Sequence, residues 1–300
     1  MLGLRRVGWF PLAFALCAIL AGCSGGSSSP TQSSSPAPTA TPPPVGSLVV
    51  PIVRDGTTEQ PVAAQVDPPA PRIGDRVSVT APGFLTREQR FEVPEIFLWP
   101  GESSYIHEVA YTEFTDGTFR TIRWTAGFTI TLDGDLANDP AIVAKAQEVA
   151  AEASRRIGFP VRVGSGGAVT VGVDESLEDQ DAVAQATVTY RGATIASARI
   201  VFWRRFEIAG GPQAAYSNTF LHELGHVLGL GHSPRITDVM TPAEGPGTFQ
   251  STYQPAEASC LQMSYARRQP GNYFPDRDPA LAAASSAIPR TTVFIDRLNR

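Results

Sequence analysis

The clearest hydrophobic pattern in the chain is a helical one between Asp139 and Gly158. Apolar residues recur there every three or four positions, so they share one face of a helix. This face consists of Ile142, Val143, Ala146, Val149, Ala150, Ala153 and Ile157. Asp139 can cap the start of the helix, Pro140 suits its first position, and Gly158 can end it. The pattern therefore predicts an amphipathic helix over residues 140–157 that backs a sheet.

Alternating apolar and polar residues predict strands after this helix. Residues 168–173 alternate, and residues 184–190 and 194–203 form two further runs on either side of Arg191-Gly192. A short connection that contains glycine, between two such runs, is typical of a β-hairpin. Strands mixed with long helices indicate an α+β fold for residues 118–278.

Short β-strand patterns dominate the preceding residues, 48–113. The strand patterns cover residues 48–50, 76–80 and 95–99, and turn sequences stand at Asp55-Gly56, Pro68-Pro69 and Pro82-Gly83. Such spacing predicts a small all-β module over residues 48–115. After the α+β part, residues 279–300 are expected to form a loosely held extension, with residues 291–295 as one candidate last strand.

The first 47 residues have no pattern of a folded domain. Arg5 and Arg6 precede an apolar run over residues 7–20, which is too short to span a bilayer and is typical of a secretory signal. Residues 24–46 consist almost wholly of Ser, Pro, Thr, Gly and Ala, which cannot bury enough apolar surface to become ordered. We therefore expect a signal peptide over residues 1–22 and a disordered tether over residues 23–47.

The charge balance bears on the partners of the mature chain. Removing Arg5 and Arg6 with the signal leaves 22 of the 24 basic residues against 29 acidic ones, a net formal charge of -7. An acidic protein lacks the basic surface that nucleic-acid binding requires, so no nucleic acid is expected as a partner. Cys260 is the one cysteine left if the signal is removed and Cys23 is modified, and we expect it to be a small buried residue.

The chemistry of the chain is concentrated in the pattern HExxHxxGxxH, formed by His222, Glu223, His226, Gly229 and His232. Two histidines four residues apart on a helix share one face, so their imidazoles can bind one ion. Glu223 lies beside the ion, where its carboxylate can accept a proton from bound water. Gly229 can adopt a positive φ, which ends the helix and lets the chain bring His232 back.

Three neutral imidazoles leave one tetrahedral position open, which is typical of a catalytic zinc site rather than a structural one. The apolar residues Leu221, Leu224 and Leu228 occupy the opposite face of the expected helix, residues 212–228. The remaining histidine, His107, is expected to have a structural or surface role.

The motif resembles that of the metzincin metallopeptidases, in which it is followed by a Met-turn. Met240 in Val239-Met240-Thr241-Pro242, together with Ser233 after the third histidine, is similar to the matrixin branch. The resemblance implies that Met240 forms an apolar floor under the metal, and that an antiparallel edge strand of the sheet binds an extended polypeptide substrate. One strand of the predicted hairpin should be this edge strand.

Met263-Ser264-Tyr265 is a rival Met-turn, similar to that of the serralysin branch. We reject it because Pro255 suits the first position of a helix, and Leu261 and Tyr265 are spaced four apart. This segment is more similar to the closing helix of a matrixin domain.

Two further resemblances concern the N-terminal part. Leu20-Ala21-Gly22-Cys23 is similar to the lipobox of bacterial lipoproteins, which implies acylation of Cys23, a membrane anchor and a location in the cell envelope, at the outer membrane or cell surface. Residues 54–64 and 81–87 resemble the carboxypeptidase regulatory-like domain, which implies that the first module is a small β-sandwich.

Some matrixin features have no counterpart in this sequence. No cysteine-switch prodomain is recognisable, so the sequence does not explain latency, and no spare histidines exist for a second, structural zinc. Calcium is an alternative to a solvated acidic loop at Asp174, Glu175, Glu178, Asp179 and Asp181. The same alternatives apply to Asp276 and Asp278.

We therefore expect a monomeric, surface-tethered zinc metalloendopeptidase that hydrolyses peptide bonds through a zinc-activated water, with Glu223 as general base. The alternative from another class is a surface binding or adhesion lipoprotein whose metal site is vestigial or structural. An exopeptidase, or a hydrolase of non-peptide amides, would share the zinc chemistry and differ in pocket shape.

Overall fold

The computed structural model of the chain describes residues 44–180, 182–210, 218–242, 250–267, 269–279 and 289–297. The expected signal peptide, Cys23 and most of the expected tether lie outside these residues. Among the described helices, none has the length and apolar character needed to cross a membrane.

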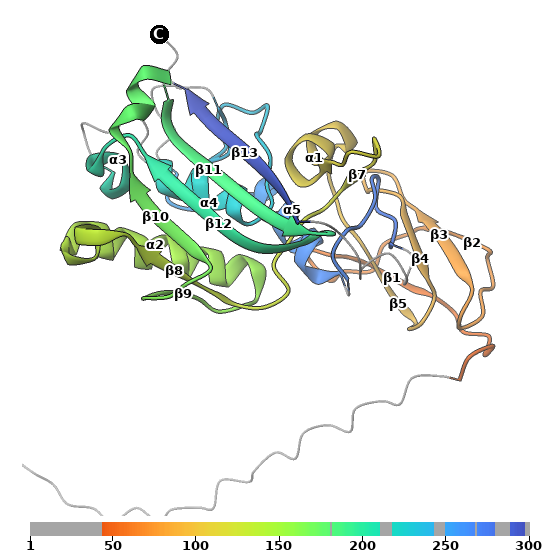
Figure 1. The fold of residues 1–300 in the computed structure, drawn as a ribbon. Coiled ribbons are helices and arrows are strands. Elements are labelled where there is room, and N and C mark those ends of the chain that lie inside the picture. Colours follow the sequence, from red (N-terminus) through yellow and green to blue (C-terminus); the bar gives the residue numbers. More distant parts are fainter. Residues whose placement is uncertain are drawn as a thin grey trace, which may run out of the picture. The chain divides into compact units, whose positions relative to one another are not determined.

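A six-stranded mixed sheet is the centre of the larger part of the fold (Figure 1). Its strands, in spatial order, are β13 (Pro289–Arg297), β11 (Ala182–Arg191), β12 (Thr194–Phe202), β10 (Val169–Val173), β8 (Phe128–Leu132) and β9 (Val161–Val163). The last four pair in parallel, whereas β11 is antiparallel to both β12 and β13. The model is therefore an α+β protein, as expected, and β10, β11 and β12 confirm the strands predicted from alternation.

The long helix α2 (Pro140–Ile157) matches its predicted bounds. The side chain of Asp139 accepts a hydrogen bond from the backbone N–H of Ala141 at 2.9 Å, and Gly158 ends the helix in the left-handed conformation with φ 73°. The predicted apolar face is buried, apart from Val143, which is half-buried. α2 packs against β8 and β9 and also against α4 (Thr219–Val227) and α5 (Pro255–Ala266).

The N-terminal strands have a small core of their own. β1 (Ile52–Asp55) pairs in parallel with β5 (Glu95–Leu98), and β2 (Gln65–Asp67), β3 (Arg76–Thr80) and β4 (Arg87–Arg90) form an antiparallel sheet. The buried residues between them are Val53, Ile73, Val77, Val79, Phe91, Ile96 and Leu98. β3 and β5 confirm two predicted strands. The third prediction, at residues 48–50, is wrong, because the strand begins only at Ile52, after Pro51.

An unexpected helix follows these strands. α1 (Ser103–Ala110) lies where only strands were expected, and it buries Tyr105, Ile106, Val109 and Ala110. These four residues belong to the larger core, with the six-stranded sheet, rather than to the small one. Short strands β6 (Thr112–Glu113) and β7 (Phe119–Arg120) follow α1, and 3-10 turns occupy Gly134–Asn138 and Glu175–Gln180. The short helix α3 (Arg205–Ala209) precedes α4.

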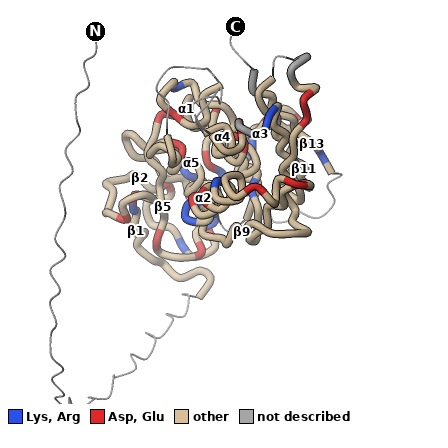
Figure 2. Tube along the Cα trace, turned by 90° about the vertical axis from the view of Figure 1, so that its left-hand side faces the viewer, with Lys and Arg blue, Asp and Glu red and all other residues tan. Residues whose placement is uncertain are grey.

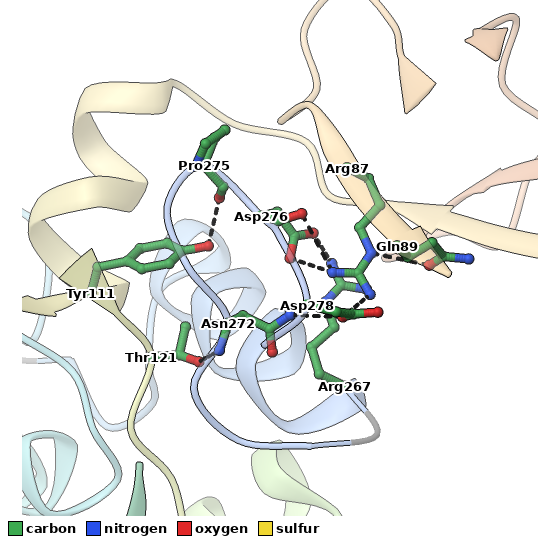
Figure 3. Close-up of polar contacts among 9 residues, drawn as sticks. All are labelled: Arg87, Gln89, Tyr111, Thr121, Arg267, Asn272, Pro275, Asp276 and Asp278. Carbon is green, nitrogen blue, oxygen red and sulfur yellow. Dashed lines mark hydrogen bonds and ion pairs between the residues drawn. The ribbon is translucent and has the colours of Figure 1, made fainter. Parts of the chain in front are cut away.

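A buried polar network joins β4 to the segment after α5 (Figure 3). The guanidinium of Arg87 binds Asp276 at 2.8 Å and Asp278 at 2.6 Å, and Arg267 also binds Asp276. Tyr111 donates a hydrogen bond to the carbonyl oxygen of Pro275 at 2.5 Å. Burial lowers the pKa of Arg267 to about 10, although the charge of Asp276 opposes this shift. Guanidinium groups thus hold both carboxylates for which calcium was an alternative.

Residues 42–300 form one compact unit by their contacts, so the boundary expected near residue 115 stays a prediction. Acidic and basic residues are both scattered over the described trace (Figure 2). The strand expected at residues 291–295 is confirmed as part of β13, which is longer than predicted and lies beside β11 (Figure 1). The expectation that one hairpin strand is the edge of the sheet is wrong, because β13 pairs with the outer edge of β11, and β12 lies between β11 and β10.

Candidate metal centre

Three histidines converge at the end of α4. His222 and His226 lie on this helix, His232 lies in the loop that follows it, and one ligand atom from each lies within 4.8 Å of the others. Their ring centroids are 4.7 to 5.5 Å apart. In the described part of the chain, no other group of three His, Cys, Asp or Glu side chains could hold a metal ion.

The turn after α4 brings His232 back toward the helix. Leu230 donates a backbone hydrogen bond to Gly225 at 2.9 Å and Gly229 donates one to His226 at 3.0 Å, which together form a Schellman motif. Gly229 has φ 97°, as its predicted role requires. A Cβ at this position would also lie 2.2 Å from the carbonyl oxygen of Ile122, so close packing demands glycine as well.

Backbone carbonyls fix the orientation of two imidazoles. Nδ1 of His222 lies 2.6 Å from the carbonyl oxygen of Val239, and Nδ1 of His226 lies 2.8 Å from that of Leu230. Since a carbonyl oxygen can only accept, each Nδ1 must carry the proton, and each Nε2 keeps a lone pair. This tautomer is the one in which histidine binds a metal through Nε2.

The acidic residue of the motif is fully buried. Glu223 follows His222 on α4 and has an exposed fraction of 0%. A buried carboxylate on the same helix as two imidazoles that could hold a metal ion is the type of group that can exchange a proton with bound water. His222, with 7% exposure, and His226, with 0%, are buried too, whereas His232 is half-buried.

Met240 packs directly against α4. It is fully buried, and a Cβ on Gly225 would lie 2.2 Å from its sulfur. Its backbone N–H donates to Glu257 at 2.6 Å, and its carbonyl accepts from the N–H of Ser233 at 2.7 Å. Met240 therefore connects the helix that carries two histidines to the loop that carries the third. Met263, the rejected rival, is buried inside α5.

A second polar group, which the sequence did not indicate, supports the His232 loop. Asp238 is buried, and its Oδ2 accepts hydrogen bonds from Tyr105 and from Ser233, both at 2.6 Å. Ser233 directly follows His232, so this carboxylate holds the backbone beside the third histidine. Tyr105 comes from α1, the helix that was not predicted, which explains why the sequence pattern alone did not reveal the contact.

An aromatic residue from the C-terminal strand covers the histidines. Phe294 on β13 stacks on the ring of His226, with centroids 4.1 Å apart and planes inclined by 5°. The ring of Phe294 also lies edge-on to that of His232, with centroids 6.4 Å apart. The sequence predicted a strand here, but nothing in it indicated contact with the histidines.

The acidic loop proposed for calcium is accounted for in part. Asp174 accepts hydrogen bonds from the backbone N–H and the hydroxyl of Ser176, and these bonds lower its pKa. Asp181 and the side chains of Glu178 and Asp179 lie outside what the structure describes.

Elsewhere, Cys260 is buried, as expected, and burial raises the pKa of its thiol. His107 packs between the rings of Phe119 and Phe274, which is a structural role.

No family model matches the chain, and no curated protein matches it in sequence. The chemistry of the site therefore rests on its own residues. Three imidazoles with two fixed tautomers and an adjacent buried carboxylate fit a divalent ion of intermediate softness, such as zinc.

Proposed function

We propose that this chain is a zinc-dependent metalloendopeptidase of the metzincin type, similar to the matrixins. The observation that carries the proposal is the convergence of His222, His226 and His232, together with the buried carboxylate of Glu223, which follows His222 on the same helix. A site kept only for structure would not need a carboxylate at this position. Zinc is the preferred ion because three nitrogen ligands leave a fourth position open for chemistry.

Other features of the fold support this assignment. The mixed sheet backed by α2, and the close approach of Met240 to Gly225, are compatible with a metzincin catalytic domain and its Met-turn. The separate core of the N-terminal strands is compatible with a small β-sandwich module. The proposal also includes a bacterial lipoprotein anchored through Cys23, monomeric and without a nucleic-acid partner.

The residues of the site divide the chemical work between them. A bound zinc ion would supply Lewis-acid activation of water and of the scissile carbonyl. Glu223 accepts the proton of the attacking water and passes it to the leaving amine. The carbonyls of Val239 and Leu230 keep the two helical imidazoles from rotating. The polypeptide substrate adds to an edge of the sheet, where backbone hydrogen bonds hold it extended.

The first test is the substitution Glu223→Ala in the purified mature chain. We expect the variant to retain zinc, measured by elemental analysis, and to lose hydrolysis of casein by at least about a hundredfold, the contribution typical of a general base. The wild-type activity should disappear with a chelator and return with zinc.

The alternative, an adhesion lipoprotein with a structural metal, predicts a different result. Zinc-loaded wild-type protein would then cleave nothing in a diverse peptide library, and Glu223→Ala would alter neither binding nor turnover. The same library separates endopeptidase from exopeptidase action by the positions of the cuts.

A further inference from the structure

The strand β11 is paired along both of its edges. β12 pairs with one edge over Ala184 to Arg191, and β13 pairs with the other over Ala182 to Arg191. Addition of a substrate strand requires unpaired backbone N–H and C=O groups. In this structure, the outer edge of β11 offers those groups only if β13 leaves it.

One face of β13 packs on the body of the protein, and one of its residues reaches the candidate metal centre. Arg290 lies over the ring of Phe114 at 5.6 Å, Thr292 contacts the hydroxyl of Tyr190 at 3.5 Å, and Phe294 stacks on His226 at 4.1 Å. These three residues are half-buried, and they alternate along the strand as one face must. Phe294 is therefore the residue through which this face of the strand contacts the histidines.

The partner strand leaves room for the aromatic ring. The residue opposite Phe294 on β11 is Ala186, whose methyl group is small enough for the phenyl ring to lean over His226. Residues directly opposite each other in an antiparallel pair lie on the same face and contact each other, so a small residue on one strand leaves room for a large one on the other. The position opposite Ala186 thus holds an aromatic side chain in this structure.

The other face of β13 makes few contacts. Val293 is 49% exposed, and the hydroxyl of Thr291 meets that of Thr189 on β11 at 3.3 Å. Thr291 itself is exposed. Thr189 and Thr291 can therefore be linked to each other without touching the histidines, and Val293 can be shortened with little loss of contact.

We propose that β13 is the resident occupant of the substrate edge of β11, and that it competes with the polypeptide substrate for that edge. The inference rests on the proposed function, because it assigns the regulation of the same site. It also names the substrate class: an extended peptide that pairs antiparallel to β11 and carries an aromatic side chain opposite Ala186. Release of β13 is then the step that opens the site, a step that the sequence leaves unexplained.

A reversible cross-link between the two strands tests this directly. Thr189→Cys with Thr291→Cys replaces a cross-strand pair of hydroxyls 3.3 Å apart, close enough for a disulfide. The double variant and its control both carry Cys23→Ser, so that this cysteine cannot form a disulfide. Cys260 is buried and does not interfere. The oxidised double variant should lose hydrolysis of an aromatic-containing peptide, and reduction with a phosphine, which is then removed before zinc is supplied again, should restore it. Thr291→Cys alone is the matched control, with and without the reductant.

Point variants on the two faces of β13 provide a second test. Phe294→Ala removes the stacked ring and should raise hydrolysis by on the order of tenfold, because it favours the state in which the strand is released. Val293→Ala, one residue away on the exposed face, should match the wild type. Hydrogen exchange, a readout independent of activity, should be faster at the β11 amides in Phe294→Ala and unchanged in Val293→Ala.

The outcomes separate the two proposals. If the oxidised double variant hydrolyses peptides as fast as its reduced form, β13 does not compete with the substrate, and the inference fails while the proposed function stands. If no zinc-loaded form, including Phe294→Ala, hydrolyses any peptide, the proposed function fails, and the regulation that rests on it fails too. Unchanged exchange in Phe294→Ala would also overturn the inference.

Discussion

Two glycines in the histidine motif show how tightly the residues around the candidate metal centre are packed. Gly229 was expected from its place after the helix, because a positive φ was needed there. Gly225 was not expected, since its role depends on Met240, which lies against it and is separated from it in the chain. A motif thus predicts which side chains can share an ion, but not which neighbours need the space between them.

At the residue scale, we predict that Gly225→Ala weakens both folding and metal binding. The added methyl group would lie 2.2 Å from the sulfur of Met240, which is fully buried and must move. Such overpacking costs about 1–3 kcal/mol of the free energy of unfolding. Chemical denaturation with and without zinc measures both effects.

A matched control is Gly164→Ala, whose new methyl group would meet only the side chain of Thr129, at an ordinary 3.5 Å. This variant should behave as the wild type. Equal effects of the two substitutions would show that Met240 does not restrict the helix.

At the element scale, α2 and α1 show what local pattern can predict. The apolar face and both caps of α2 are local signals, so its bounds were predicted correctly. α1 has its apolar residues at Tyr105, Ile106, Val109 and Ala110, which is helical spacing, yet the strand patterns around it concealed this short signal. Likewise, the sequence offered residues 291–295 as a candidate last strand, but the pairing of this strand with β11 depends on contacts between residues 102 positions apart.

The cap of α2 gives a second prediction. Asp139→Ala removes the side-chain oxygen that accepts from Ala141 and Ile142, so we expect a loss of about 1 kcal/mol in the free energy of unfolding. Glu148→Ala, on the same helix, is the control, because its ion pair with Lys145 is exposed and contributes little. A thermal denaturation series distinguishes the two; a larger loss in Glu148→Ala would contradict the capping role.

At the scale of the whole molecule, the Arg87 network joins segments 189 residues apart in the chain. The sequence showed Asp276 and Asp278 only as acidic residues near a proline, with calcium or solvent as their expected partners. No local pattern connects them to an arginine in β4. Long-range pairing of this kind is where reasoning from sequence reaches its limit, because it depends on how whole elements pack.

This network gives a third prediction. Asp276→Ala should destabilise the protein by about 3–5 kcal/mol, because two buried guanidinium groups would lose their shared carboxylate. Asp278→Ala should cost less, since the side chain of Asp278 is 41% exposed and water can replace it. Urea denaturation of both variants measures the difference; equal losses would show that burial does not determine the cost.

The place of β13 at the end of the sheet has a consequence for solubility. With this strand in position, the long β11 lies inside the sheet, and the opposite border is the short β9. Without it, β11 would present an unpaired edge along a strand of ten residues to other molecules, the arrangement from which copies of a protein join strand to strand. A segment that leaves the sheet to admit a substrate would therefore have to return promptly, or the molecules would aggregate.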